Sequence, residues 1–381
     1  MRIAIDYTAA VNQHAGIGRY VRGLVDALAA FDTSNEYVLF YAYQRQTKPR
    51  IAALSKPNFR QRAIPVSDRI LTILSQRLAV PLPMDLLTGP VDVFHSPDFV
   101  LPHVRRAVTV LTVHDLSFLL FPECADSGLR SYLEKAVPRS VARADLITAD
   151  SLNTKNDLVC LLDAEPERVE VVFGGVDEKF RPLRDDWRLL AAVRRKYRID
   201  FPFILSIGVI EPRKNLGRLI RAYALLKARG GFAHKLLIVG RKGWLYEGVF
   251  HTVAELGLDK DVIFLGYVSD SDLPVLYNLA DVFAFPSLYE GFGFPVLEAM
   301  ACGTPVVSSN RSSLPEVVGE AGLLASPDDV GAIAAALDQM LNDSHLRDDL
   351  VQRGLQRARQ FTWQRAAERI VEVYSRAARE R

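Results

Sequence analysis

Short apolar segments alternate with longer amphipathic segments along most of the chain. The longer segments carry apolar residues at helical spacing, as Val21, Leu24, Val25 and Leu28 do. The short segments are rich in β-branched and aromatic residues and end at polar or glycine-containing loops, which is typical of buried strands. They cover residues 3–7, 91–95, 108–114, 146–149, 169–173, 203–207, 235–239, 262–265 and 282–285. This alternation predicts an α/β protein with parallel sheets.

The chain is long enough for two domains. Its 381 residues exceed what one ordinary hydrophobic core holds. Pro182 and the polar string R-D-D-W just after it predict a linker, so we place a boundary near residue 182. Strands and helices alternate on both sides of it, which predicts two Rossmann-like domains, residues 1–182 and 183–361. A last helix, within 362–381, carries Ala366, Ile370, Val373 and Tyr374 along one side.

Composition and charge exclude several classes of protein. Hydrophobic residues make up 49% and charged residues 24%, with a net charge of +2, so we expect a globular protein that does not bind nucleic acid. Cys124, Cys160 and Cys302 are widely spaced and fit a reduced, cytoplasmic compartment. The chain starts on a strand, and no uninterrupted apolar run reaches the length of about 18 residues that a membrane span needs. We therefore expect neither a signal peptide nor a transmembrane helix.

Residues 45–80 are unusually basic. Eight cations face a single acid, Asp68, which gives this stretch a charge of +7. The cations are Arg45, Lys48, Arg50, Lys56, Arg60, Arg62, Arg69 and Arg77, and an apolar row beside them consists of Ile70, Leu71, Ile73, Leu74 and Leu78. Two interpretations stay open: the row packs on the protein's own core, or the stretch makes a peripheral contact with the inner face of a membrane.

A glycine-rich corner follows the strand at residues 282–285. Gly291 and Gly293 allow a close backbone approach, and Pro295 is suited to the first turn of a short helix. The backbone amides from Gly293 to Val296 are therefore candidate donors to an anion. Glu290 lies before this turn and Glu298 within the helix, and two carboxylates suit hydroxyl groups better than phosphate.

Three other loops at strand ends carry candidate site residues. Arg213 and Lys214 lie between a strand and a helix N-terminus, where a bound anion would offset their unfavourable interaction with the helix dipole. Gly16 and Gly18 lie at the first strand-to-helix turn, the usual place for ligands in an open α/β sheet. His114 also ends a strand.

The string E-G-F-G-F-P-V-L-E-A-M-A-C-G-T-P-V-V closely resembles the signature of retaining glycosyltransferases of family 4. That resemblance implies the GT-B fold, in which two Rossmann-like domains face a central cleft and the C-terminal helix crosses back to the first domain. It also implies that residues 1–182 bind the acceptor and residues 183–361 the nucleotide-sugar donor.

The resemblance further assigns roles to individual residues. Glu290 would contact the donor sugar and Glu298 the ribose, while His114 would lie beside an outer sugar hydroxyl. Arg213 and Lys214 in the string P-R-K-N would bind the donor diphosphate. The remaining donor-binding positions implied are Gly16, Gly18, Tyr267, Val268, Gly291, Phe292, Gly293, Phe294, Pro295 and Val296.

The strings G-I-G-R-Y and P-R-K-N are similar to bacterial mannosyltransferases of surface polysaccharide synthesis. We therefore expect retaining transfer of a hexose, mannose from GDP-mannose, to a saccharide or lipid-linked saccharide. The resemblance implies a front-face reaction in which the leaving phosphate oxygen helps to take the acceptor's proton. We assign no D-x-D triplet to a divalent ion and expect no metal or other cofactor. The alternatives are a UDP-sugar-dependent glycosyltransferase, a sugar phosphorylase or epimerase on the same fold, and a non-catalytic sugar-nucleotide binding module.

Overall fold

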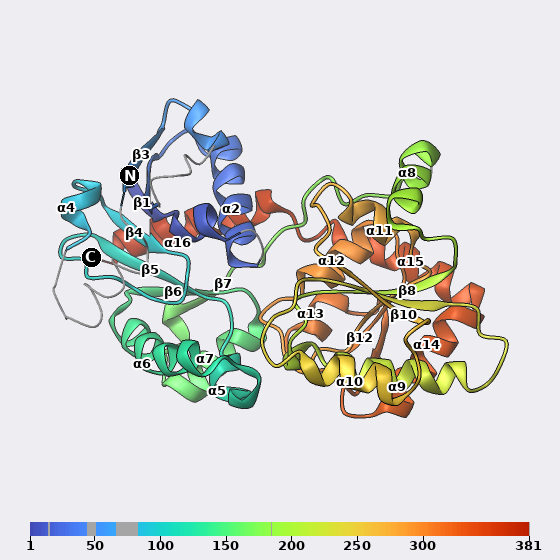
Figure 1. Cartoon of the computed structure of the whole chain (residues 1–381). Helices are drawn as coiled ribbons and strands as arrows, with labels where there is room; N and C mark the ends of the chain where they lie inside the picture. Colours follow the sequence, from blue (N-terminus) through green and yellow to red (C-terminus); the bar gives the residue numbers. More distant parts are fainter. Residues whose placement is uncertain (14–15, 44–50, 66–82, 184, 381) are drawn as a thin grey trace. The chain divides into compact units, whose positions relative to one another are not determined.

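The computed structural model describes residues 1–13, 16–43, 51–65, 83–183 and 185–380 (Figure 1). The chain forms two compact units. Unit 1 consists of residues 1–119, 127–175 and 362–381, and unit 2 consists of residues 120–126 and 176–361. The main change of unit thus falls between Gly175 and Val176, before the linker predicted near residue 182. In addition, residues 120–126 group with unit 2, which the sequence did not predict.

Unit 1 contains a seven-stranded sheet in the order β3-β2-β1-β4-β5-β6-β7, and all recorded strand pairs are parallel. The strands are β1 (Arg2–Asp6), β2 (Glu36–Ala42), β3 (Phe59–Ile64), β4 (Val93–Ser96), β5 (Val108–Val113), β6 (Leu146–Ala149) and β7 (Val169–Val171). Every residue of β5 is buried, as expected for a central strand covered on both faces.

Unit 2 contains a six-stranded parallel sheet in the order β10-β9-β8-β11-β12-β13. Its strands are β8 (Phe203–Ile207), β9 (Lys235–Val239), β10 (Val262–Gly266), β11 (Val282–Phe285), β12 (Val306–Ser309) and β13 (Leu323–Ala325). In chain order the sheet of unit 2 therefore runs 3-2-1-4-5-6, and that of unit 1 runs the same way with a seventh strand added at its end, which is the doubly wound Rossmann arrangement. The predicted α/β class with two Rossmann-like domains is confirmed.

Helices cover both faces of each sheet. In unit 1 they are α1 (Thr8–Asn12), α2 (Ile17–Phe31), α4 (Asp85–Thr88), α6 (Ser127–Arg143), α7 (Leu152–Leu162) and α16 (Trp363–Arg379), and α5 (Ser117–Leu120) ends at the edge of the unit. In unit 2 they are α8 (Trp187–Tyr197), α9 (Leu216–Lys227), α10 (Glu247–Glu255), α11 (Leu273–Leu279), α12 (Phe294–Ala301), α13 (Leu314–Val318), α14 (Val330–Asn342) and α15 (Ser344–Ala358). Short 3-10 turns are Ala52–Ser55, Pro122–Cys124, Pro166–Arg168 and Pro212–Lys214.

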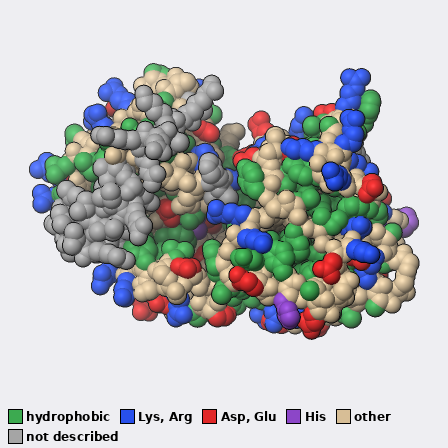
Figure 2. Space-filling model, in the orientation of Figure 1, with side chains coloured by type: hydrophobic (Ala, Val, Ile, Leu, Met, Phe, Trp, Pro, Cys, Tyr) green, Lys and Arg blue, Asp and Glu red, His purple; other side chains and the backbone are tan. Residues whose placement is uncertain are grey.

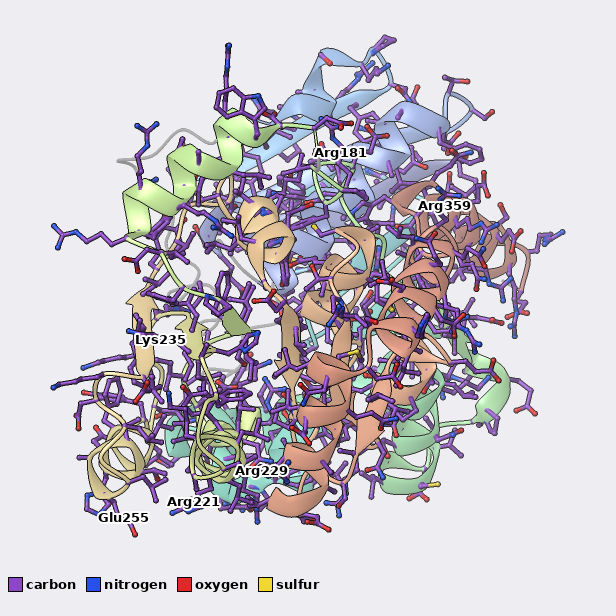
Figure 3. All side chains as sticks on the ribbon, turned by 90° about the vertical axis from the view of Figure 1, so that its right-hand side faces the viewer. Arg181, Arg221, Arg229, Lys235, Glu255 and Arg359 are labelled. Carbon is purple, nitrogen blue, oxygen red and sulfur yellow. The ribbon has the colours of Figure 1, made fainter. Side chains whose placement is uncertain are left out.

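The sheet of unit 2 separates two hydrophobic cores. Leu205 and Phe283 pack with residues of α11 and α12 on one face, whereas Ile204 and Val282 pack with residues of α9, α10 and α14 on the other. This follows from the period of two along a strand. The outer side chains of α9 and α10, among them Arg221 and Glu255, point away from the sheet, and Arg229 follows the end of α9 (Figure 3). On the face in Figure 2, basic side chains project over α8.

The C-terminal helix α16 belongs to unit 1, although it follows the whole of unit 2 in sequence. The Thr362 side chain caps its N-terminus by accepting from the Arg365 amide. On its buried side, the Tyr374 hydroxyl lies 2.7 Å from Nδ1 of His95, and Trp363 lies edge-on to Tyr20. The predicted return of the last helix to the first domain is thus confirmed.

The apolar row of the basic stretch and five of its cations lie outside the described residues. The other three cations are described, and Lys56, Arg60 and Arg62 are exposed, with both arginines on strand β3. No helix in the described part of the chain combines the length and apolar character that crossing a bilayer requires.

Candidate active site

The candidate site of unit 2 lies where its strand order reverses. Strands β8 and β11 pair with each other, but the chain continues outward from them in opposite directions across the sheet. Ligands of open α/β sheets bind beyond the carboxyl ends of the strands at such a switch point. The loop after β8 carries Arg213 and Lys214, and the loop after β11 carries Glu290. Topology therefore brings these residues together although they are distant in sequence.

Backbone and side-chain hydrogen bonds join the turn at Pro212–Lys214 to the β11 loop. The Leu288 amide donates to the Arg213 carbonyl at 2.9 Å. Asn215, which adopts the left-handed region at φ 58°, donates from its side chain to the carbonyls of Pro286 at 3.0 Å and Pro327 at 2.7 Å. These bonds fix the positions from which Arg213 and Lys214 project.

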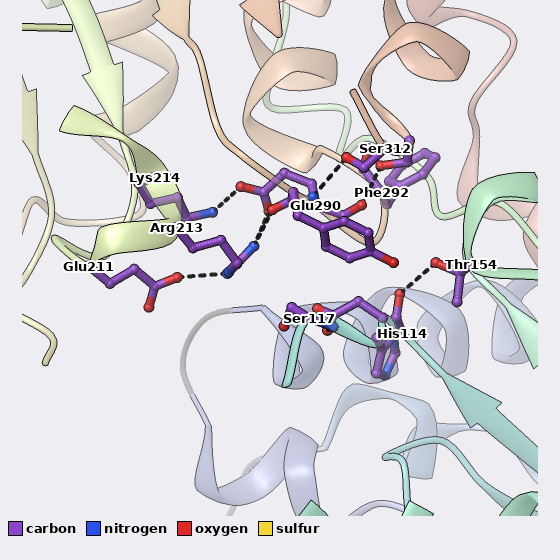
Figure 4. A network of polar contacts seen from close by, with 12 residues as sticks. His114, Ser117, Thr154, Glu211, Arg213, Lys214, Glu290, Phe292 and Ser312 are labelled. Atoms are coloured by element: carbon purple, nitrogen blue, oxygen red, sulfur yellow. Dashed lines mark hydrogen bonds and ion pairs between the residues drawn. The ribbon is translucent and has the colours of Figure 1, made fainter. Parts of the chain in front are cut away.

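Four charged side chains form one compact cluster at this point (Figure 4). Lys214 Nζ lies 2.6 Å from Glu290 Oε1, and Arg213 Nη1 lies 2.9 Å from Glu290 Oε2. The other side of the guanidinium group, Nη2, donates to Glu211 Oε1 at 2.7 Å. We call these four residues, Glu211, Arg213, Lys214 and Glu290, the charge cluster. Its two cations and two carboxylates balance.

Opposite charges determine the ionisation of Glu290. Burial by itself raises its pKa, but Arg213 and Lys214 outweigh burial and lower the pKa of Glu290 to about 2. Glu290 is therefore a carboxylate at any physiological pH, which makes it an acceptor of hydrogen bonds and not a general acid. The sequence predicted an anion beside Arg213 and Lys214, and in this structure Glu290 supplies that negative charge.

Two serines after β12 hold the backbone of the Glu290 loop. Ser312 Oγ accepts from the Glu290 amide at 2.9 Å, and Ser313 Oγ lies 2.8 Å from the Glu290 carbonyl and 2.7 Å from that of Phe292. Neither serine was among the site residues predicted from the sequence. They could have been identified from their position in the loop after β12, the strand next to β11. Neighbouring parallel strands end at the same edge of a sheet, so their loops lie close together.

The second glutamate has a different environment. Glu298 is 2% exposed on α12, and its Oε2 accepts from the Tyr277 hydroxyl at 2.9 Å. Glu290 and Glu298 therefore have different hydrogen-bond partners, as expected from their places before and within the helix. Tyr277 was not among the site residues predicted from the sequence.

The predicted row of donor amides at this helix start needs a correction. Pro295 has no N–H group, and the Val296 amide donates to the Gly293 carbonyl at 3.0 Å. These two positions therefore do not offer the free donors that the sequence predicted. Gly293 itself has a φ of 118°, and a Cβ atom there would lie 2.8 Å from the Leu314 side chain, so both conformation and space require glycine.

In unit 1, His114 follows β5 and is buried at 7% exposure. Its Nδ1 lies 2.7 Å from Asp150 Oδ2, and its Nε2 lies 3.0 Å from the Pro97 carbonyl, to which it can only donate. Burial by itself lowers the pKa of His114, but Asp150 outweighs burial and raises it to about 9. Burial also raises the pKa of Asp150, and at neutral pH Nδ1 of His114 carries the proton that lies between the two side chains. The sequence analysis did not identify Asp150.

The two glycines that the sequence placed at the first strand-to-helix turn lie at and within the start of α2, because the short helix α1 comes between β1 and this point. Gly16 has a φ of 56° before α2, and a Cβ atom there would have no neighbour within 4 Å among the described residues. At Gly18 a Cβ atom would lie 2.1 Å from the Gln13 carbonyl oxygen and 2.8 Å from that of Ala9. Close packing of α2 on the preceding helix thus explains Gly18 without a ligand, and its role in donor binding stays a prediction.

The remaining predicted positions lie after β10, where Tyr267 is 72% exposed and Val268 is buried. The chain contains D-x-D strings at residues 259–261 and 270–272. In each, one carboxylate contacts a lysine: Asp261 with Lys227 at 3.0 Å and Asp272 with Lys196 at 2.5 Å. No group of three or more His, Cys, Asp or Glu side chains that could hold a metal occurs among the described residues. Metal independence stays a prediction.

Most of each half of the chain matches a known protein family. A family described as "Glycosyltransferase Family 4" matches residues 14–180, and one described as "Glycosyl transferases group 1" matches residues 192–357. Among solved structures, sucrose-phosphate synthase from Thermosynechococcus elongatus has a TM-score of 0.77 at 22% identity, covering 99% of this chain and 98% of that one. Anabaena HepE in complex with UDP-glucose has a TM-score of 0.74 at 19% identity, covering 98% and 99%. The fold is therefore that of the GT-B glycosyltransferases.

Relatives in sequence are closer. O-antigen chain mannosyltransferase B of Escherichia coli is 39% identical over 284 residues, covering 74% of each chain. Serotype-specific mannosyltransferase WbdA of Escherichia coli is 34% identical over 273 residues, which are 70% of this chain but 33% of that protein. The chain belongs to glycosyltransferase family 4 and is a glycosyltransferase.

The proton between His114 and Asp150 predicts a dependence of stability on pH. A histidine whose folded pKa lies above its unfolded value of about 6.5 stabilises the fold below pH 6.5, and this contribution is lost as pH rises through about 9. In Asp150→Asn the pKa of His114 falls, so we expect the decline in melting temperature between pH 6.5 and 9.5 to flatten. The difference is on the order of 3 kcal/mol at most.

Thermal unfolding at a series of pH values measures this effect. His251→Gln, which changes an exposed histidine of unit 2, is the matched control and should keep the wild-type slope. An Asp150→Asn curve parallel to that of the wild type would show that the pair does not hold its proton as described.

Proposed function

We propose that the protein is a retaining, metal-independent glycosyltransferase that moves mannose from GDP-mannose to a saccharide or lipid-linked saccharide in polysaccharide synthesis. The observation that supports this most directly is the charge cluster at the switch point of unit 2, where Arg213 and Lys214 converge on Glu290. Each of the three residues matches the position at which the family resemblance places the diphosphate-binding pair and the sugar-contacting glutamate.

The chemistry follows from the charges. A departing nucleoside diphosphate gains negative charge as the glycosidic bond breaks, and two preorganised cations in a half-buried site stabilise it. Their side chains are 18% exposed for Arg213 and 12% for Lys214, so little water screens them. Glu290, ionised and acceptor-only, suits sugar hydroxyl groups. In a front-face reaction the leaving phosphate oxygen itself helps to take the acceptor's proton.

Donor binding on this proposal requires an exchange of partners. In this structure Glu290 occupies both cations, so a donor diphosphate must displace it from Arg213 and Lys214. The released carboxylate then has free lone pairs for the sugar. The arriving diphosphate takes over the contacts with Arg213 and Lys214, while Glu290 stays ionised beside it.

The names of the relatives support mannose, and the HepE complex keeps the alternative of a UDP-sugar donor open. The direct test is incubation of the protein with GDP-mannose, UDP-glucose and other nucleotide sugars, with and without a saccharide acceptor. We expect release of GDP from GDP-mannose, dependent on acceptor and unchanged by EDTA, with the α-anomeric configuration of the donor kept in the product. Release of UDP alone, an inverted product or loss of activity in EDTA would each contradict the corresponding part of the proposal.

Substitution of Glu290 separates its two roles. Glu290→Gln should lower turnover by about two to three powers of ten, because the contact with the reacting sugar is weakened. It should keep or increase affinity for the nucleoside diphosphate, because the competing carboxylate is gone. Glu298→Gln is the matched variant and should weaken nucleotide binding instead. Calorimetric titration with the nucleoside diphosphate measures its affinity for each variant, and a turnover assay measures the rate. Equal losses of nucleotide affinity in both variants would show that the roles are wrongly assigned.

A lipid-linked acceptor requires access to a membrane surface, which we propose for the basic stretch of unit 1. Its described part supports this, because Arg60 and Arg62 are exposed on β3, the edge strand of the described sheet. Anionic headgroups favour each nearby cation by about 1 kcal/mol. The apolar row that would insert lies outside the described residues.

Sedimentation with vesicles tests this proposal. The wild type should bind vesicles that contain anionic lipid at low salt and should bind less at physiological salt. Arg60→Gln combined with Arg62→Gln should weaken binding about tenfold or more, at about 1 kcal/mol for each cation. The control combines Arg221→Gln with Arg229→Gln, two exposed arginines of unit 2 (Figure 3), and should bind like the wild type. Wild-type protein that ignores anionic vesicles at low salt would favour a soluble acceptor.

A further inference from the structure

The carboxylate of Glu211 has no part in the function proposed above, although it belongs to the charge cluster. It is 2% exposed, and its Oε1 accepts from Arg213 Nη2 at 2.7 Å (Figure 4). We propose that Glu211 is a positioning residue that keeps Arg213 in place when the donor diphosphate displaces Glu290. This inference rests on the proposed function, in which Glu290 and the diphosphate exchange places.

Arg213 uses two nitrogen atoms in different ways. Nη1 donates to Glu290 Oε2 at 2.9 Å and to the Tyr289 carbonyl at 2.8 Å, whereas Nη2 donates to Glu211. Departure of Glu290 therefore leaves the guanidinium group with an ionic contact on one side and a carbonyl on the other. Because the group is planar and rigid, these two contacts are enough to preserve its orientation.

Lys214 differs from Arg213 in its contacts, because its ionic contact is with Glu290 and not with Glu211. Its Nζ donates to Glu290 Oε1 at 2.6 Å and lies 5.0 Å from the centre of the Phe285 ring. An ammonium group on a flexible stem then follows whichever anion is present. The two cations thus differ: Lys214 can move with the anion, and Arg213 is held.

The backbone around Glu211 is itself fixed. The Ile210 amide donates to the Arg241 carbonyl at 3.0 Å, and the Gly243 amide donates to the Ile210 carbonyl at 3.0 Å. A Cβ atom at Gly243 would lie 2.6 Å from the Val209 side chain and 3.6 Å from Cβ of Glu211, so the two loops pack closely. The Glu211 carbonyl accepts a hydrogen bond from the Lys214 amide at 3.2 Å. Glu211 is therefore a rigid support for Arg213.

The charge of Glu211 fits a role in positioning Arg213 better than a role in binding the diphosphate. A buried carboxylate is costly unless it is paired, and near a diphosphate it repels the ligand. A site selected only to bind the diphosphate tightly would gain by lacking this charge. A carboxylate that holds an arginine in the geometry that the transition state needs can raise the reaction rate, even though it weakens binding of the diphosphate in the ground state.

Two substitutions at Glu211 separate these roles. Glu211→Ala removes both the charge and the acceptor, and it should lower kcat by about ten- to a hundredfold through misplacement of Arg213. Glu211→Gln keeps an acceptor for Nη2, so kcat should recover to within severalfold of the wild type. The control, Asp32→Ala, removes a carboxylate of unit 1 that is 6% exposed and accepts from Asn35 and Tyr37. It should lower the melting temperature and leave kcat of the folded fraction unchanged.

A double-mutant cycle completes the test. In an Arg213→Ala background, Glu211→Ala should cause little further loss of kcat, because its target is gone. If Glu211 only balances charge, Ala and Gln will instead act alike, tightening nucleoside-diphosphate binding with kcat preserved. If it is only structural, the melting temperature alone will change. Either result overturns the inference.

The outcome for Arg213 keeps the two proposals apart. Arg213→Ala with wild-type turnover contradicts the proposed function itself. Arg213→Ala with strongly reduced turnover, beside a fully active Glu211→Ala, contradicts only the role of Glu211.

Discussion

The attraction between two cations and one buried glutamate is the interaction on which the candidate site depends. Glu290 comes after β11, while Arg213 and Lys214 come after β8, and the site exists because these strands are neighbours at the point where the strand order reverses. The doubly wound sheet thus does more than support the loops. It brings the loops after β8 and β11 together at the carboxyl edge, and oppositely charged groups meet there.

The balance of charge in this cluster stabilises the loops that carry it. Two unpaired cations in a half-buried loop would repel each other and lose hydration, at a cost of several kcal/mol for each buried ion. With Glu290 and Glu211 present, each cation has an ionic partner. A site built to bind an anion therefore contains its own anion, and ligand binding becomes a competition. Affinity is reduced by this competition, and the displaced carboxylate becomes available for the sugar.

Local pattern was sufficient to predict most of the fold. Apolar runs predicted β6, β8, β9 and β11 with the bounds that the structure has. Strands β2, β3 and β13 were not predicted, although β2 is an almost fully buried run. The sequence identified Glu290, Arg213 and Lys214 as candidates, but it did not indicate that they contact one another. Such contacts depend on strand order, which a local pattern does not contain.

The residues that the sequence analysis missed have a common property. Asp150 holds His114 at the carboxyl edge of one sheet, and Glu211 holds Arg213 at the carboxyl edge of the other. Both carboxylates are buried, and both contact a cationic side chain that the sequence had already indicated. A lone Asp or Glu within an ordinary loop gives no signal, because charged residues are common in loops. Once the fold is known, burial provides that signal, since a carboxylate rarely stays buried without a partner that needs it. In a two-domain fold of this kind, a buried carboxylate that contacts a candidate cation is therefore hard to identify from the sequence. It becomes evident once the structure shows its burial and its partner.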